Sequence, residues 1–276
     1  MKYLPSENPL VSIQMITYNH EDYIAQAIEG VLMQKTSFKI ELVIGEDCST
    51  DSTREICEEY VRKYPTIIRL LPSQSNIGII QNGIRTLESC RGKYIALCEG
   101  DDYWTDPYKL QNQIGFLAEN PLYVMSFHKI DFLVGGEQIK GNYYPLPPKS
   151  TLNIHDIILR HYIPTCSLVF KKDCLPKQFP EWFFKSRIGD IPIEILLASK
   201  GLTYYHNESM GCYRKNKTSI THNKEQKIQG RKTYLFVYKN LNKTFQYKYW
   251  LLFYYKIILL RLGYIKDALG LNESLN

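Results

Sequence analysis

Three carboxylates stand within four residues of the chain, directly after an apolar run. Glu99, Asp101 and Asp102 follow residues 94–98, which have the composition of a buried strand, and Gly100 separates the first acid from the other two. Crowded carboxylates repel one another and raise one another's pKa unless they share a cation. An all-oxygen set suits Mg²⁺ or Mn²⁺, with water and substrate phosphates as further ligands. The stretch therefore indicates a divalent metal that bridges a diphosphate, and the competing interpretation is an ordinary Asp-closed turn.

Two more polar clusters follow apolar runs that have the character of strands. Glu46 and Asp47 come at the end of 40–45, and the residues 17–21, Thr-Tyr-Asn-His-Glu, follow 11–17. The carboxyl ends of parallel strands meet at one edge of a sheet, where α/β proteins bind their ligands. With parallel strands, all three clusters converge there, beside helix N-termini that favour anions. The pattern predicts a pocket for a nucleotide diphosphate.

Apolar periodicity predicts the elements that would position these clusters. Short apolar runs alternate with segments whose apolar residues recur every three or four positions, which is typical of βαβ units. We therefore expect an α/β fold with a mainly parallel central sheet flanked by helices. Asp51 or Ser52 is the expected cap of one helix, where Ser52 and Glu55 have the spacing of a capping box. Residues 135–150 have the composition of a loop. The expected strands are 11–17, 40–45, 67–71, 94–98, 123–127, 166–171 and 203–205, and the expected helices are 21–34, 52–64, 79–90, 107–119, 155–160 and 192–200.

Four segments in a fixed order resemble the family 2 inverting glycosyltransferases of the GT-A fold. The match extends over about residues 9–120 and more weakly to about 215. The resemblance implies a GT-A domain over 1–220, with a nucleotide half at 9–120 and an acceptor half at 121–220, followed by a tail at 221–276. The four segments are Val11-Ser12-Ile13 with Thr17-Tyr18-Asn19, then Glu46-Asp47-x-Ser49-Thr50-Asp51, then Asn76-Ile77-Gly78, and then Gly92-Lys93-Tyr94-Ile95-Ala96-x-x-x-Gly100-Asp101-Asp102.

The resemblance also implies a function for individual residues. Asp47 would hydrogen-bond the base and favour uracil, so a UDP-sugar is the expected donor. Asp102 would be the main ligand of Mn²⁺ or Mg²⁺, joined by Asp101 and, as a weaker candidate, His222. The residues expected to bind the nucleotide sugar are Thr17, Tyr18, Asn19, Glu21, Asp47, Asn76, Gly78, Asn82 and Asp101.

Inversion by direct displacement needs a base that takes the proton of the attacking hydroxyl. The segment 188–201 is similar to the one that carries the family's base, and Asp190 is therefore the expected catalytic residue. A helix cap is the alternative interpretation of Asp190, and Glu194 is a weaker candidate for the base. Indole rings stack on sugars, although core packing is the commoner use of Trp. The residues expected on the acceptor side are Trp104, Thr165 and Trp182.

Missing motifs narrow the choice of function. The sequence has no G-x-G-x-x-G after its first strand and no P-loop, which argues against a dinucleotide oxidoreductase or a P-loop enzyme. It lacks the Gln-x-x-Arg-Trp signature of processive synthases, which favours addition of a single sugar. The resemblance implies a role in building surface polysaccharide or lipopolysaccharide on a glycan or lipid-linked acceptor. Glu46 and Glu99 stand where many relatives have Asp, which leaves the nucleotide base open. The alternative is a non-catalytic sugar-nucleotide-binding or membrane-scaffold module.

Positive charge is concentrated near the end of the chain. The 276 residues carry a net charge of +6, but 214–248 alone holds ten basic residues and one acid. This suggests an anionic partner such as a membrane surface, and no nucleic-acid-binding motif accompanies it. Residues 247–265 are strongly apolar but contain Lys256 and Arg261. An interfacial helix, or a helical hairpin packed on the domain, is therefore expected rather than a membrane span.

Cysteine usage and the N-terminus bear on the compartment. The seven cysteines are an odd number without a C-x-x-C pair, which favours reduced thiols. The first residues have no apolar stretch typical of a secretory signal. The expected location is cytoplasmic, with peripheral attachment to the inner face of the cell membrane through the tail.

Overall fold

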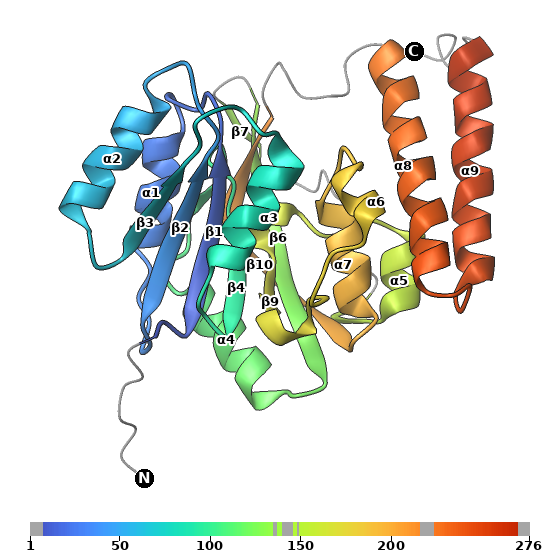
Figure 1. Cartoon of the computed structure of the whole chain (residues 1–276). Helices are drawn as coiled ribbons and strands as arrows, with labels where there is room; N and C mark the ends of the chain where they lie inside the picture. The colour runs from blue at the N-terminus through green and yellow to red at the C-terminus, as the bar shows by residue number, and fades with distance from the viewer. Residues whose placement is uncertain (1–7, 135–136, 140–145, 148, 216–223, 270–276) are drawn as a thin grey trace.

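Ten strands form one sheet within the described part of the chain (Figure 1). The computed structural model describes residues 8–134, 137–139, 146–147, 149–215 and 224–269. The strands are β1 (Val11–Thr17), β2 (Ile40–Glu46), β3 (Ile68–Pro72), β4 (Tyr94–Leu97), β5 (Tyr103–Trp104), β6 (Tyr123–Val134), β7 (Glu137–Ile139), β8 (Thr151–Leu152), β9 (Val169–Lys171) and β10 (Leu202–Lys215). Their order is β3-β2-β1-β4-β9-β6-β10-β5, with β7 beside β6 and β8 beside β10.

The expected α/β fold is present, and its sheet is mixed rather than purely parallel. The pairs β1–β2, β2–β3, β1–β4 and β6–β10 are parallel, but β9 lies antiparallel between β4 and β6. The chain enters β9 from a 3₁₀ turn at Thr165–Ser167 and leaves it into another at Lys172–Cys174. Because β4 and β6 both run antiparallel to β9, β6 and its parallel neighbour β10 point the same way as β4 and β1. The carboxyl ends of β1 to β4, β6 and β10 therefore share one edge.

Helices cover both faces of the sheet (Figure 1). Apolar residues of α1, α2 and α4 pack with Ile13 of β1 on one face. Residues of α3, α5 and α7 pack with Ile95 of β4 on the other. Apolar side chains on both faces explain why the strands appear as continuous apolar runs. The helices are α1 (Ile24–Leu32), α2 (Thr53–Lys63), α3 (Ile79–Ser89), α4 (Lys109–Glu119), α5 (Ile154–Leu159), α6 (Glu181–Phe184), α7 (Asp190–Ala198), α8 (Lys224–Thr244) and α9 (Trp250–Leu269).

The tail forms a hairpin of α8 and α9 that packs beside α5 (Figure 1). Val237, Leu241 and Phe253 belong to the same apolar cluster as α5 and α7. Nζ of Lys256 donates to the backbone oxygen of Leu159 at the end of α5 (3.0 Å). The expected packed hairpin is therefore present, while the domain boundary near residue 220 stays a prediction. Of the helices described, none is both long and apolar enough to span a bilayer.

Two local predictions were wrong. The capping box is absent, because Ser52 makes no side-chain cap bond and Oδ1 of Asp51 accepts the N–H of Thr53 instead (3.0 Å). Oε2 of Glu21 accepts the N–H of Ser52 (2.9 Å), which is the bond that Glu55 would have made. The strands predicted at 123–127 and 203–205 are longer, because β6 and β10 pair with each other over most of their length. Most of the loop expected at 135–150 lies outside the described residues.

Candidate active site

The acidic loop between β4 and β5 is held by β10. The backbone N–H of Arg214 donates to Oδ1 of Asp102 (2.9 Å), and its guanidinium donates to the backbone oxygen of Asp101 (2.7 Å). A side chain at Gly100 would come within 2.7 Å of Oγ1 of Thr17, so glycine permits the close approach of this loop to β1. The loop therefore packs directly against the end of β1.

Arg214 is itself fixed on several sides. Its guanidinium lies 5.0 Å from the ring centre of Tyr23 and 4.7 Å from that of Tyr103, and it donates to Oε1 of Gln26. The residue is 7% exposed. The guanidinium of Arg214 therefore lies next to the acidic loop, where it donates to the backbone oxygen of Asp101.

Of the three carboxylate residues of the loop, Asp102 is buried, and Glu99 and Asp101 are half-buried. Burial, followed by the charges of Asp101 and Glu99, raises the pKa of Asp102 well above its usual range. Burial and the charge of Asp101 raise the pKa of Glu99 to about 8, and the charge of Asp190 adds to the shift. Among the described residues, Oε2 of Glu99 is buried without a hydrogen-bond partner. A bound cation would offset these shifts, because it stabilises the ionised carboxylates.

Asp47 joins the loop after β2 to the loop before α3. Its Oδ1 accepts the N–H of Ile77 and its Oδ2 accepts the N–H of Gly78, both at 2.9 Å. Its own N–H donates to the oxygen of Thr17 (3.1 Å), and the residue is 2% exposed. Each carboxylate oxygen keeps a further lone pair. The predicted bond from Asp47 to the nucleotide base stays a prediction.

The loop after β1 is tied to the loop after β2. Asn19 has a left-handed φ of 54°, and its Oδ1 accepts the N–H of Thr50 (2.9 Å). Oγ1 of Thr17 lies 3.2 Å from Nδ1 of His20. Tyr18 is 41% exposed at this edge, which leaves its ring open to a ligand. The predicted donor residues 17–21 are therefore beside Asp47, although Glu21 is engaged by the start of α2.

The remaining predicted donor residues lie around the start of α3. Gly78 has a φ of 86°, a conformation that favours glycine, and precedes the first residue of α3. Oδ1 of Asn76 accepts the N–H of Gly78 (3.1 Å). Asn82 is 2% exposed, donates to the oxygen of Gly45 (2.8 Å) and accepts from Nε of Arg85 (2.9 Å). Asn82 therefore braces β2 against α3.

Asp190 begins α7 and lies in a second polar cluster. The N-cap position of α7 is Gly189 and Asp190 is the first helical residue, so Asp190 is not the helix cap. Potential ligand atoms of Asp190, His161 and Glu194 all lie within 4.8 Å of one another. The charge of Asp190 also reaches Glu99 of the acidic loop, where it raises the pKa. The structure thus brings Asp190 near the loop of Asp101 and Asp102.

The predicted acceptor-side residues differ in their surroundings. Trp104 is 2% exposed, its Nε1 donates to the oxygen of Cys166 (2.7 Å), and Nζ of Lys109 lies 4.1 Å from its ring centre. A ring covered in this way has no open face for a sugar, so the stacking prediction for Trp104 is wrong. Nε1 of Trp182 donates to Oγ1 of Thr244 (3.0 Å), which ties α6 to α8.

Thr165 and His222 complete the predicted set. Thr165 is half-buried in the 3₁₀ turn before β9. His222 lies outside the described residues, so its predicted part in metal binding stays a prediction. The pairing of His161 with Glu194 was not predicted from the sequence, because a single His outside any motif does not indicate which residue it will contact.

The first half of the chain matches a family model. The model is described as "Glycosyl transferase family 2", and it matches residues 12–175. The matched segment contains β1 to β4, the acidic loop and Asp47, which are the parts of the candidate site that came from the strand ends.

Two relatives extend the match beyond that segment. An uncharacterized protein of Mycobacterium tuberculosis is 33% identical over 209 residues, which are 74% of this chain and 60% of the relative. The chain thus spans about 60% of the length of the first relatives that it matches. TuaG of Bacillus subtilis, a glycosyltransferase assigned to teichuronic acid biosynthesis, is 30% identical over 238 residues, which are 85% of this chain and 89% of TuaG.

Solved structures share the fold. TarS residues 1–349 of S. aureus, in complex with UDP, superpose with a TM-score of 0.61 at 16% identity, covering 84% of this chain and 65% of that one. The mannosyltransferase PcManGT from Pyrobaculum calidifontis, in complex with GDP-Man and Mn²⁺, gives 0.62 at 14% identity, covering 88% and 67%. The expected GT-A fold is therefore confirmed.

Proposed function

Because the chain belongs to glycosyl transferase family 2, we propose that it transfers a sugar from a nucleotide diphosphate sugar to an acceptor hydroxyl with inversion. The observation that carries the proposal is the charge coupling of Glu99 to Asp101 on one side and to Asp190 on the other. It supports a single site in which a metal-binding loop faces a carboxylate base. Direct displacement needs these two parts together, because the leaving group and the attacking hydroxyl lie on opposite sides of the sugar.

The acidic loop fits a divalent cation. Its donors are hard carboxylate oxygens, and Oε2 of Glu99 is buried without a partner in the described chain. Asp102 would be the main ligand and Asp101 would assist, with His222 as a further candidate. Mn²⁺ or Mg²⁺ bound there would neutralise charge on the diphosphate as it leaves. PcManGT, a protein of the same fold, was solved with Mn²⁺, which supports the proposal without distinguishing the two metals.

The donor pocket would occupy the edge formed by the ends of β1, β2 and β3. Tyr18 is exposed there, and Asn76 and Gly78 lie at the start of α3, where backbone N–H groups favour phosphate. A UDP-sugar remains our choice, since TarS was solved with UDP. The GDP-Man in PcManGT shows that the fold itself accepts another base, so the base is to be determined by assay.

Asp190 would accept the proton of the acceptor hydroxyl. It is half-buried and is the first helical residue of α7. Its cluster with His161 and Glu194 would hold it in place. Because TuaG is assigned to teichuronic acid biosynthesis, we propose a surface-polysaccharide intermediate, glycan or lipid-linked, as the acceptor. The enzyme would then work in the cytoplasm at the inner face of the membrane.

A screen of sugar nucleotides tests this function. The purified chain is incubated with UDP-, GDP- and dTDP-sugars and Mn²⁺, and release of the nucleoside diphosphate is measured with and without EDTA. We expect slow hydrolysis of one donor class that EDTA abolishes and that Asp102→Asn lacks. Donor binding by calorimetry without turnover on any donor or lipid-linked acceptor would instead support the non-catalytic module. Release that is insensitive to EDTA would contradict the metal-dependent mechanism.

A further inference from the structure

One half of α9 is apolar and open to solvent. At about 100° per residue, the large apolar residues of α9 that are exposed fall within one half of the helix, while Phe253 and Ile257 face the core. A helix that is apolar on all sides is ordinarily buried on all sides. The outer face of α9 consists of Trp250, Leu251, Tyr254, Tyr255, Ile258, Leu259, Leu262 and Ile265, each at least 39% exposed.

The hairpin that carries this face is strongly basic, and its two acids, Glu225 and Asp267, stand near its ends. Residues 228–265 contain seven Lys or Arg and no Asp or Glu. Arg261 is exposed on the same side of α9 as the apolar residues. A second copy of the chain would therefore meet the outer face with a like-charged hairpin, which is unfavourable, whereas an anionic surface would neutralise it.

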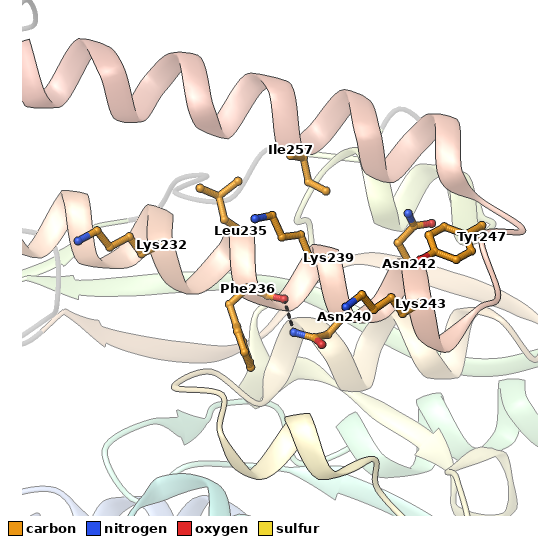
Figure 2. A pocket seen from close by; sticks show the side chains of 9 residues that line it. All are labelled: Lys232, Leu235, Phe236, Lys239, Asn240, Asn242, Lys243, Tyr247 and Ile257. Carbon is orange, nitrogen blue, oxygen red and sulfur yellow. Dashed lines mark hydrogen bonds between the residues drawn. The ribbon is translucent and has the colours of Figure 1, made fainter.

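A groove along α8 adds a site for anions to this hairpin. The groove encloses about 650 Å³, and Lys232, Lys239 and Lys243 line it together with Phe236 and Tyr247 (Figure 2). Ion pairs recorded for the described residues do not include these three lysines. Cationic side chains beside apolar ones match a ligand with a phosphate and an adjoining hydrocarbon part.

We propose that the hairpin docks on an anionic lipid bilayer. The outer face of α9 lies at the boundary between headgroups and acyl chains, and the lysines of α8 bind headgroup phosphates. Amphipathic helices with Trp, Leu and basic residues adopt this position. Trp250, Tyr254 and Tyr255 have the aromatic rings that favour the interface, where an apolar ring and a polar tip are both satisfied.

The position of α8 gives the docking a consequence for the reaction. Tyr234 of α8 packs against the apolar cluster that contains Ile191, the residue after Asp190 in α7, so α8 lies beside the helix that carries the candidate base. A docked hairpin therefore holds Asp190 close to the membrane, where a lipid-linked hydroxyl arrives. This consequence rests on the proposed function, whereas the docking itself does not.

Vesicle sedimentation with the full chain tests the docking. We expect binding to vesicles of phosphatidylglycerol and phosphatidylcholine that weakens with salt. Leu251→Ser with Leu259→Ser and Leu262→Ser should lower the partition coefficient by about 100-fold or more. Lys232→Gln with Lys239→Gln and Lys243→Gln should lower it on the order of 100-fold for anionic vesicles and little for pure phosphatidylcholine.

Matched controls separate docking from folding and from catalysis. The exposed residues Lys39, Lys63 and Lys93, changed together to Gln, remove the same charge outside the hairpin and should leave binding unchanged. Donor hydrolysis should stay at the wild-type rate in all three triple variants, so a failed donor screen and failed docking are distinguishable. Wild-type binding by both hairpin variants, or no vesicle binding by the wild type, would overturn the proposal. So would a wild-type dimer in sedimentation velocity that the leucine variant dissociates.

Discussion

Nδ1 of His161 lies 3.2 Å from Oε2 of Glu194, one turn of α7 beyond Asp190. Burial alone would lower the pKa of His161, but the carboxylates of Glu194 and Asp190 raise it to about 9, while Lys256 of α9 acts in the opposite sense. His161 is therefore an imidazolium at neutral pH. This cation lies beside the candidate base, since potential ligand atoms of His161, Asp190 and Glu194 are all within 4.8 Å of one another.

This ion pair predicts how stability depends on pH. The unfolded pKa of His is about 6.5 and the folded value about 9, so the stabilisation is fully present below pH 6.5 and is lost as the pH rises through 9. His161→Gln should lower the free energy of unfolding by up to about 3 kcal/mol near pH 6.5. The difference from wild type should shrink towards pH 9.5.

Urea unfolding between pH 6 and 9.5 measures this dependence. His155→Gln is the control, because His155 is exposed on the neighbouring helix α5 and lies outside this ion pair. A difference between wild type and His161→Gln that stays constant across the range would show that the pair is not charged in the way we describe.

Replacement of Asp102 tests the metal site. Asp102→Asn keeps the shape of the side chain and its capacity to accept the N–H of Arg214, but it removes a charge from the acidic loop. Loss of a group that orients a metal ligand costs about 10- to 100-fold in metal affinity, and loss of a ligand itself should cost about 100-fold or more. Donor hydrolysis titrated with Mn²⁺ measures the change. An unaltered Mn²⁺ dependence would remove Asp102 from the site.

Replacement of Asp190 tests the base separately from donor binding. Asp190→Asn should keep the donor affinity, because the nucleotide site is built from β1, β2 and α3, but transfer should fall by about 10²- to 10⁴-fold. Calorimetric titration with the donor and transfer to an acceptor are measured on the same preparation. Glu194→Gln is the comparison, since it alters the neighbouring charge without removing the base. Transfer at the wild-type rate by Asp190→Asn would exclude it as the base.

Sequence reasoning succeeded where local pattern and topology determine the outcome. The apolar runs that became β1, β2 and β4 placed Thr17, Asp47 and Asp102 at one edge, because parallel strands must end together. The hairpin of α8 and α9 was likewise foreseen as one of two alternatives. The periodicity of a segment indicates which element it forms, and these predictions depended on little more than that periodicity.

Long-range partners were beyond that reasoning. Glu21 bonds to Ser52 across two loops and displaces the predicted capping box. Trp104 became part of the core because Lys109 and the Cys166 backbone cover it. His161 and Glu194 lie far apart in the sequence and meet only through the packing of α7 beside α5. Each of these contacts depends on the tertiary arrangement, which a local pattern does not encode.

Glu41, at the opposite end of β2 from Asp47, predicts acid sensitivity. Its side chain is 4% exposed, accepts from Oγ of Ser12 (2.6 Å), and pairs with Arg69 (2.9 Å) and Arg91 (2.8 Å). Burial by itself would raise the pKa of Glu41, but these bonds lower it to about 2. Against an unfolded value of about 4.3, the stabilisation is present above pH 4.3 and is lost as the pH falls towards 2.

Glu41→Gln should therefore destabilise the fold at pH 7 and matter less in acid. The pKa difference alone corresponds to about 3 kcal/mol, but Arg69 and Arg91 stay in contact with water, so we expect about 2 kcal/mol. Denaturant unfolding at pH 7 and at pH 3 measures both values, with Glu59→Gln on the exposed face of α2 as the control. A neutral carboxyl and an amide have nearly the same shape, so the substitution mainly removes the charge of Glu41. An equal loss of unfolding free energy at the two pH values would mean that Glu41 acts through packing rather than through its charge.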